Sequence, residues 1–245
     1  MSQVRRKERD HGASSGTVGP RLIAKPLLQN TIYVVLMGVV LFASAGTLHW
    51  PGAWVFLVTS AVLGPACGWW LARIDPALLA ERARPIIQAD QPAADKLFML
   101  ALVLAVLIWL VAMGLERRMR ALSVPPVLQA IGFATYIAST LFILRVFREN
   151  TFAAPVVKVQ AARAHHVVST GPYAFVRHPM YSGMMLFFVG VPLLLGSWWG
   201  LVIAPVFFLL FAIRTRIEER ELMRGLPGYA DYAARVRYRL VPGLF

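Results

Sequence analysis

The sequence has few charged residues for its length, and fewer of them are acidic than basic. Of 245 residues, 15% are charged and 58% are apolar, whereas typical soluble domains are about 25% charged. Only 12 aspartates and glutamates stand against 25 lysines and arginines, which gives a formal net charge of +13. The apolar content excludes a disordered chain. Cys67 is the only cysteine, which excludes a scaffold of internal disulfides.

The sequence motifs of common soluble proteins are missing too. It contains no G-x-G-x-x-G or G-K-S/T phosphate loop, no H-E-x-x-H and no G-x-S-x-G. Any nucleotide-like cofactor would therefore bind outside a Rossmann crevice. The histidines form no metal-binding spacing with Cys67, so we expect no metal. The basic residues match no helix-turn-helix, zinc-finger or basic-aromatic pattern, so we expect no nucleic-acid partner.

Four stretches contain no charged residue at all: 26–72, 97–115, 121–144 and 178–213. A helix needs about 20 apolar residues to cross a bilayer. The first stretch is long enough for two spans and breaks at a turn-like segment around Pro51. A soluble helical bundle would need charged outer faces on these helices, and they have none. The pattern predicts four transmembrane helices within 26–144.

The last charge-free stretch, 178–213, predicts a helical hairpin. Its 36 residues would reach about 54 Å as helix, whereas two full crossings need about 60 Å. Gly196–Gly200 is typical of a turn at its middle, so we expect arms that borrow flanking residues or stop short of the far surface. The predicted fold class is an all-α polytopic membrane bundle of about six spans, with a cytoplasmic C-terminal helical segment.

The basic residues set the expected orientation. Residues 1–25 form a basic tail, which the positive-inside rule places in the cytoplasm. Six crossings return the basic C-terminus to the same side, so we expect both termini in the cytoplasm of a bacterial cytoplasmic membrane. Arg117, Arg118 and Arg120 disagree, because they would face outward. We attribute the net charge to this orientation and to attraction between the protein and anionic membrane lipids.

Polar residues are organised at the predicted mouth of the hairpin. A Gly171–Pro172 turn precedes Arg177, and Pro179 suits the first turn of a helix. His178, Tyr181 and Ser182 then share one helical face.

A second polar group follows the hairpin. Arg214 and Glu218 are one helical turn apart, and Glu219 is adjacent. The hairpin would bring them beside His178. Polar groups near hydrocarbon are costly to hold, which makes them candidates for function.

Residues 145–245 resemble the isoprenylcysteine carboxyl methyltransferase family, whose superfamily also contains integral-membrane phospholipid N-methyltransferases. Four blocks carry the resemblance: Gly171–Pro172–Tyr173; Arg177–His178–Pro179–Met180–Tyr181–x–Gly183; Glu218–Glu219–x–x–Leu222; and Tyr229–x–x–Tyr232 followed by the tail 235–243. Residues 145–245 are thus the predicted cofactor-binding catalytic region. The long basic N-terminal tail departs from the family pattern.

The resemblance implies an enzyme that uses S-adenosylmethionine in a cytoplasm-facing pocket and takes a lipophilic acceptor from the bilayer. The implied cofactor-binding residues are His166, Val167, Gly171, Tyr173, Arg177, His178, Tyr181 and Glu219. The implied catalytic residues are Glu218, Arg214, Arg235 and Arg239. One of the two adjacent glutamates would hold the methionine ammonium. The other would serve the acceptor, by removing a proton if the acceptor is an amine.

Two alternatives remain open at the level of sequence. Membrane reductases of the sterol-reductase type share a similar C-terminal block and use NADPH. A non-catalytic accessory protein could also keep the fold. The acceptor could be a prenylcysteine-like carboxylate, a phospholipid amine or a small lipophilic molecule, and the sequence does not specify the oligomeric state.

Overall fold

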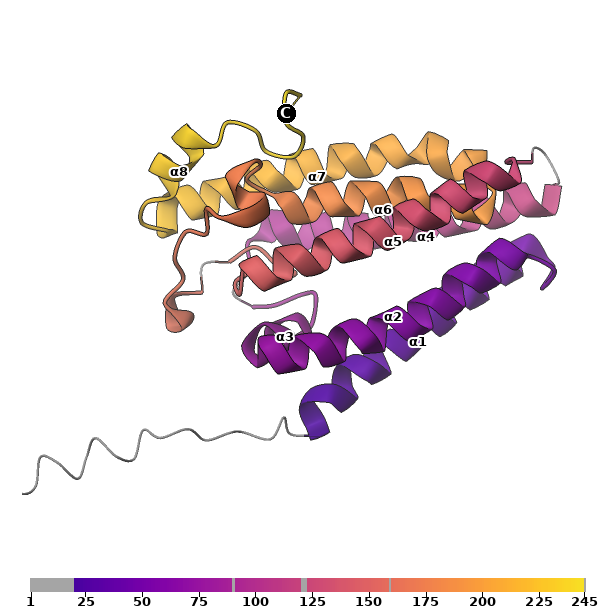
Figure 1. The fold of residues 1–245 in the computed structure, drawn as a ribbon, viewed down its shortest axis with the longest axis horizontal. Helices are drawn as coiled ribbons and strands as arrows, with labels where there is room; N and C mark the ends of the chain where they lie inside the picture. The colour runs from indigo at the N-terminus through magenta and orange to yellow at the C-terminus, as the bar shows by residue number, and fades with distance from the viewer. Residues whose placement is uncertain (1–19, 90, 120–122, 159, 245) are drawn as a thin grey trace, which may run out of the picture.

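The computed structural model describes residues 20–89, 91–119, 123–158 and 160–244. Helices form the described architecture (Figure 1). In chain order these are α1 (Pro20–Ala45), α2 (Pro51–Ile74), α3 (Pro76–Arg82), α4 (Ala93–Met119), α5 (Pro126–Glu149), η2 (Ala161–Arg163), η3 (Gly171–Ala174), α6 (Pro179–Leu195), α7 (Trp198–Gly225) and α8 (Tyr229–Arg235).

Within these residues, five helices are long and apolar enough to cross a membrane by length and composition: α1, α2, α4, α5 and α7. The sixth predicted span is the shorter apolar helix α6. This confirms an all-α polytopic membrane fold. Most of the predicted basic tail, including Arg5–Arg9, lies outside the described residues, as does Arg120. Helix α1 starts at Pro20, so Arg21 and Lys25 lie in that helix.

The predicted hairpin is present, and its arms are unequal. Helix α6 has 17 residues, about 26 Å of helix, and α7 has 28, about 42 Å. Gly196 ends α6 in the left-handed conformation, with φ of 75°, and Ser197 caps α7 by accepting a hydrogen bond from the Gly200 amide. Because α7 continues beyond the charge-free stretch, it carries Arg214, Glu218 and Glu219 on the same helix.

Small residues set the close packing of α5 against α6. A Cβ atom added at Gly190 would lie 2.7 Å from the backbone nitrogen of Tyr136, and one at Gly132 would lie 2.4 Å from that of Leu194. The hydroxyl of Ser139 donates to the carbonyl of Gly183 at 2.8 Å. Such contacts are typical of helix pairs in membranes. They hold α6 against α5 along most of the length of α6.

The bundle has two different ends (Figure 1). One end, called the site end below, holds the segment with α3, the long connection 150–178 and the C-terminal segment with α8. The other, called the far end, holds the connections after α1, α4 and α6. Most of the described polar connecting segments therefore lie at the site end.

Candidate functional site

The start of α6 is held by the C-terminal tail. The backbone amides of Arg177 and His178 donate to the carbonyls of Tyr238 and Arg239, both at 2.9 Å. His178 is the residue before Pro179, which occupies the first helical position as predicted. The tail thus fixes the Arg-His-Pro segment from outside, and this contact joins residues that are distant in sequence.

The two adjacent glutamates of α7 point to different surroundings. Neighbouring residues on a helix are about 100° apart around its axis. The carboxylate of Glu218 accepts a hydrogen bond from the Tyr181 hydroxyl at 2.7 Å and lies 3.7 Å from Nδ1 of His178. The Tyr181 ring stacks between His178 and Phe211. The fold therefore brings the motif on α6 to Glu218, as the sequence predicts.

Glu219 is buried among basic side chains. Its Oε1 accepts a hydrogen bond from Nε of Arg177 at 2.7 Å and lies 3.3 Å from Nε2 of His178. Its Oε2 accepts a hydrogen bond from Nε of Arg239 at 2.9 Å. Arg177 also donates to the carbonyls of Ala233 and Val236. Glu219 is therefore the centre of an ion-pair network that joins α6, α7, α8 and the tail.

A cavity with an empty volume of about 760 Å³, open mouth included, lies beside this network at the site end. Seven of the residues predicted from sequence line it: His166, Val167, Tyr173, Arg177, His178, Tyr181 and Glu218.

The other predicted site residues do not line this cavity. Glu219 and Arg239 border a groove on another face. Arg235 is exposed at the end of α8. Gly171 has a structural reason to be glycine, since its φ is +55° and an added Cβ would lie 2.7 Å from the Glu149 carboxylate.

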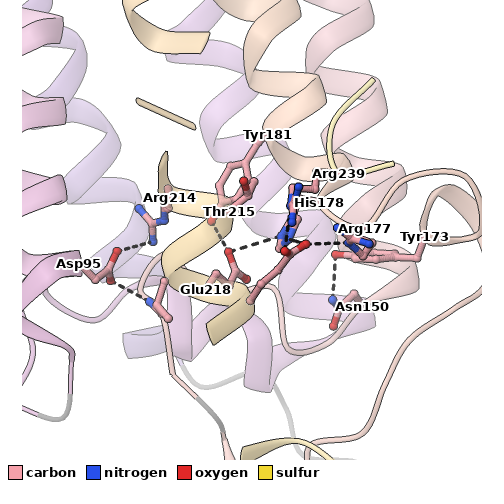
Figure 2. Close-up of polar contacts among 12 residues, drawn as sticks. Asp95, Asn150, Tyr173, Arg177, His178, Tyr181, Arg214, Thr215, Glu218 and Arg239 are labelled. Carbon is pink, nitrogen blue, oxygen red and sulfur yellow. Dashed lines mark hydrogen bonds and ion pairs between the residues drawn. The ribbon is translucent and has the colours of Figure 1, made fainter. Parts of the chain in front are cut away.

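Arg214 is also placed differently from the prediction. It is buried and faces α4, where it pairs with Asp95 at 3.4 Å and contacts the sulfur of Met99 at 3.0 Å. Its guanidinium lies over the ring of Tyr181 on the side away from the ion-pair network (Figure 2). Arg214 therefore supports Tyr181 from outside the cavity.

One wall of the cavity is formed by residues 153–158, and buried charges clamp this wall. Arg82 donates to the carbonyl of Ala153 at 2.8 Å, and Arg214 donates to that of Pro155. The Val157 amide donates to Asp95 at 2.9 Å. The ammonium of Lys158 pairs with Glu81 at 2.6 Å. Burial lowers the pKa of Arg82 to about 10, so it stays charged at neutral pH.

Several lining residues were not predicted. They are Asn150, Phe152, Lys158, His165, Glu221, Leu222, Leu226, Tyr229 and Tyr232, with apolar residues of the clamped wall. Leu222, Tyr229 and Tyr232 stand in motif blocks, which was a usable signal. Asn150, Phe152, Lys158 and His165 follow from the path of the 150–168 connection, which has no periodic pattern.

Tyr229 is notable because its hydroxyl is buried and, among the described residues, has no hydrogen-bond partner. A buried polar atom without a partner costs about 1–3 kcal/mol, so it needs an explanation. Burial raises the pKa of Tyr229 above its ordinary value, so the hydroxyl keeps its proton. It can therefore donate or accept a hydrogen bond from a molecule in the cavity.

His165 closes the cavity against Phe152, with ring centroids 4.3 Å apart. Its Nδ1 accepts the Gln160 amide at 3.3 Å, which requires an unprotonated nitrogen. Burial, with further contributions from His166 and Arg163, lowers the pKa of His165 to about 4. This part of the cavity is therefore neutral at pH 7.

The cavity combines an anionic end, at Glu218, with apolar and aromatic walls. Such a lining suits a ligand that has a cationic part and a flat apolar part. Within the described residues, no group of three or more His, Cys, Asp or Glu could hold a metal ion. The lining offers carboxylate and hydroxyl groups that can accept or donate protons.

Comparison with known proteins gives two findings. Residues 127–227 match the family model for phospholipid methyltransferase. Among solved structures, the chain is similar to the eukaryotic intramembrane Ras methyltransferase, isoprenylcysteine carboxyl methyltransferase, with a TM-score of 0.53, 17% identity, and coverage of 88% of this chain and 75% of that one. No protein of curated function matches the chain. The predicted resemblance to this group of membrane methyltransferases is confirmed, and the structural likeness establishes the shared fold.

Proposed function

From residues 127–227, which carry the sequence pattern of the phospholipid methyltransferase family, we propose that this integral membrane protein transfers a methyl group from S-adenosylmethionine to a lipophilic acceptor. The observation that carries the proposal is the placement of Glu218, whose carboxylate faces the cavity and accepts the Tyr181 hydroxyl at 2.7 Å.

The residues of the cavity fit this cofactor. A carboxylate stabilises an ammonium group through a charge-assisted hydrogen bond. Glu218 offers such a group, and the Tyr229 hydroxyl offers a further polar contact. The aromatic and aliphatic wall, with Asn150, would hold the adenosine part.

Glu218, rather than Glu219, is the better candidate for holding the cofactor ammonium. Both oxygens of Glu219 already contact the basic side chains of Arg177 and Arg239. In our proposal Glu219 positions Arg177, His178 and the tail. His178 lies close to both carboxylates and orients them.

When bound, S-adenosylmethionine supplies the methyl group and its positively charged sulfonium. The chain's own contribution is positioning, because this in-line displacement needs little covalent chemistry from a protein. Tyr181 orients the Glu218 carboxylate, and its ring is held between His178 and Phe211. If the acceptor is an amine, Glu221 at the cavity lining could take its proton.

A lipophilic acceptor agrees with the position of the site at the ends of the long apolar helices. An apolar groove begins at Ser182, next to Tyr181, and continues along α6 and the C-terminal tail, where Met185, Leu186 and Leu240 line it. We propose that the site end faces the cytoplasm, because α1 begins there and the basic C-terminal segment lies there. Membrane lipids are the expected surroundings and no nucleic acid is expected.

The test is calorimetric titration of S-adenosylmethionine and of NADPH into the detergent-purified full-length protein. We expect saturable binding of S-adenosylmethionine alone, weakened at least tenfold in Glu218→Gln because a hydrogen-bonded charge pair contributes about 1.5–3 kcal/mol. The matched control is Asp231→Asn, the same acid-to-amide change at an exposed position of α8. Binding of NADPH alone would indicate a reductase, and binding of neither by folded protein would indicate an accessory protein.

A further inference from the structure

The outer face of α7 changes from aliphatic to basic along a single stripe. Val202, Val206, Leu209 and Ile213 are exposed on the bundle, with Val202 77% and Leu209 63% accessible. Their spacing of three and four residues places them on one helical face. The next positions on this face are Arg216, Arg220 and Arg224, all exposed. The stripe that faces the hydrocarbon therefore continues directly into arginines.

The change occurs at the depth of the lipid headgroups. Helix α7 starts at Trp198, at the far end, where tryptophan is typical of the membrane interface. At 1.5 Å per residue, Arg216 lies about 27 Å and Arg224 about 39 Å along the helix from Trp198. A hydrocarbon core is about 30 Å thick, and the headgroup layers bring the bilayer to about 40–45 Å. The arginines therefore span the headgroup layer at the site end.

These arginines line a shallow groove. Its walls are Arg216, Arg220, Met223 and Arg224 of α7, Arg239 of the tail, and Glu219, with an empty volume of about 750 Å³ that includes open solvent. We call this the arginine groove. Its four cations face one acid, and the carboxylate of that acid already contacts Arg177, His178 and Arg239. Arg224 has an ion pair with Glu221 at 3.6 Å, but both side chains are exposed, so the pair is weak.

We propose that the arginine groove binds the phosphate of an anionic membrane phospholipid, as a site separate from the cofactor cavity. Guanidinium groups bind phosphate oxygens in pairs of parallel hydrogen bonds. A basic cluster at the membrane surface attracts anionic lipid by about 1 kcal/mol per residue. The partner is a lipid rather than a soluble anion because the groove continues the lipid-facing stripe, which places acyl chains against Leu209 and Ile213. The proposal does not depend on the methyltransferase activity.

The test is native mass spectrometry of the full-length protein in detergent, titrated with dioleoyl phosphatidylglycerol, dioleoyl phosphatidylcholine or inorganic phosphate. We expect saturable binding of phosphatidylglycerol, and weaker binding of phosphatidylcholine because its headgroup carries a compensating cation. Arg220→Gln/Arg224→Gln should weaken phosphatidylglycerol binding by about tenfold or more. Added salt should weaken it further.

The control is Arg145→Gln/Arg148→Gln, which removes the same charge from exposed arginines at the site end of α5, outside the groove. An equal loss in control and groove variants would overturn the proposal, because it would show general attraction to a basic surface. Competition by inorganic phosphate at the lipid's own concentration would also overturn it, since it would identify a soluble anion as the ligand. If the double variant loses its cooperative melting transition, the single Arg224→Gln provides the same comparison.

Discussion

Two carboxylates at opposite ends of α7 show how similar groups can differ in role. At the far end, Glu116 of α4 is 2% exposed and binds the start of α7. It accepts the Ser197 hydroxyl and the amides of Trp198 and Trp199, at 3.2 and 3.0 Å. At the site end, Glu218 accepts the Tyr181 hydroxyl, has a side chain 27% exposed, and lines the cavity.

The comparison teaches that a buried charge does not by itself identify a functional site. Glu116 interacts with the free amides at a helix N-terminus, where negative charge is favourable. Its acceptor positions are used by the fold. Glu218 accepts one hydroxyl from the fold and also lines the cavity. The difference is that the protein itself supplies the donors to Glu116, whereas part of the Glu218 carboxylate faces the cavity.

The largest expected effect comes from Glu219, whose partners all belong to the fold. Glu219→Gln leaves Arg177 buried without its counter-charge. Breaking a buried pair in this way typically costs 3–5 kcal/mol. We expect the midpoint of thermal unfolding in detergent to fall on the order of 10 °C. Arg239→Gln should cost less, because the Arg239 side chain is 33% exposed. If the two variants lost equal stability, the network would not be centred on Glu219.

The second prediction concerns the far end. Ser197→Ala removes the N-cap of α7 and one donor to Glu116. Losing a cap costs about 0.5–2 kcal/mol, and the buried acid also loses a partner, so we expect a destabilisation of about 2 kcal/mol. Affinity for S-adenosylmethionine should stay unchanged in folded protein. Thermal unfolding and calorimetric titration measure the two effects separately. A fall in affinity without a fall in stability would contradict a purely structural role for Ser197.

The matched change at the site end is Tyr181→Phe. It removes the hydroxyl that Glu218 accepts and keeps the ring stacked between His178 and Phe211. Because the carboxylate loses its orienting donor, we expect affinity for S-adenosylmethionine to fall about tenfold, or roughly 1.4 kcal/mol. Stability should change less than in Ser197→Ala. Calorimetry on both variants provides the comparison, and unchanged affinity would show that Tyr181 does not orient the acid.

Much of the fold could be predicted from the distribution of charge. The charge-free stretches identify the apolar helices, and the turn at Gly196 identifies the hairpin, because both depend on local chain properties. The sequence pattern did not show that α7 would extend past Ile213 to Gly225. The unequal arms arise at the site end, where α7 continues while α6 begins at Pro179.

The site was predictable where its residues lie on one helical face. The spacing of His178 and Tyr181 predicts one shared helical face, and both residues line the cavity. Which of Glu218 and Glu219 lines it was not predictable, because the tail brings Arg239 to Glu219. The burial of Arg214 against α4 was not predictable for a similar reason, since its partner Asp95 lies on a different helix, distant in sequence. Long-range pairing decided both cases.

The smallest expected effect concerns pH and the cavity wall. His165 has a pKa of about 4 in the folded protein, below its ordinary value of 6.5, because burial disfavours its charged form. The unfolded chain therefore binds more protons between these values, and stability rises with pH across this window. The contribution of His165 is complete above about pH 6.5 and is lost as the pH falls toward 4. Protonation would also remove the acceptor for the Gln160 amide.

His165→Asn isolates this effect from the carboxylates that titrate in the same range. The Asn side-chain oxygen can replace Nδ1 as an acceptor for the Gln160 amide, and it does not titrate. We expect the unfolding midpoint of the wild type to fall relative to that of His165→Asn from pH 6.5 to pH 4, and its S-adenosylmethionine affinity to follow the same trend. A difference that stayed constant over this range would show that His165 is not held neutral by the fold, and that the wall closes the cavity equally well with a charged ring.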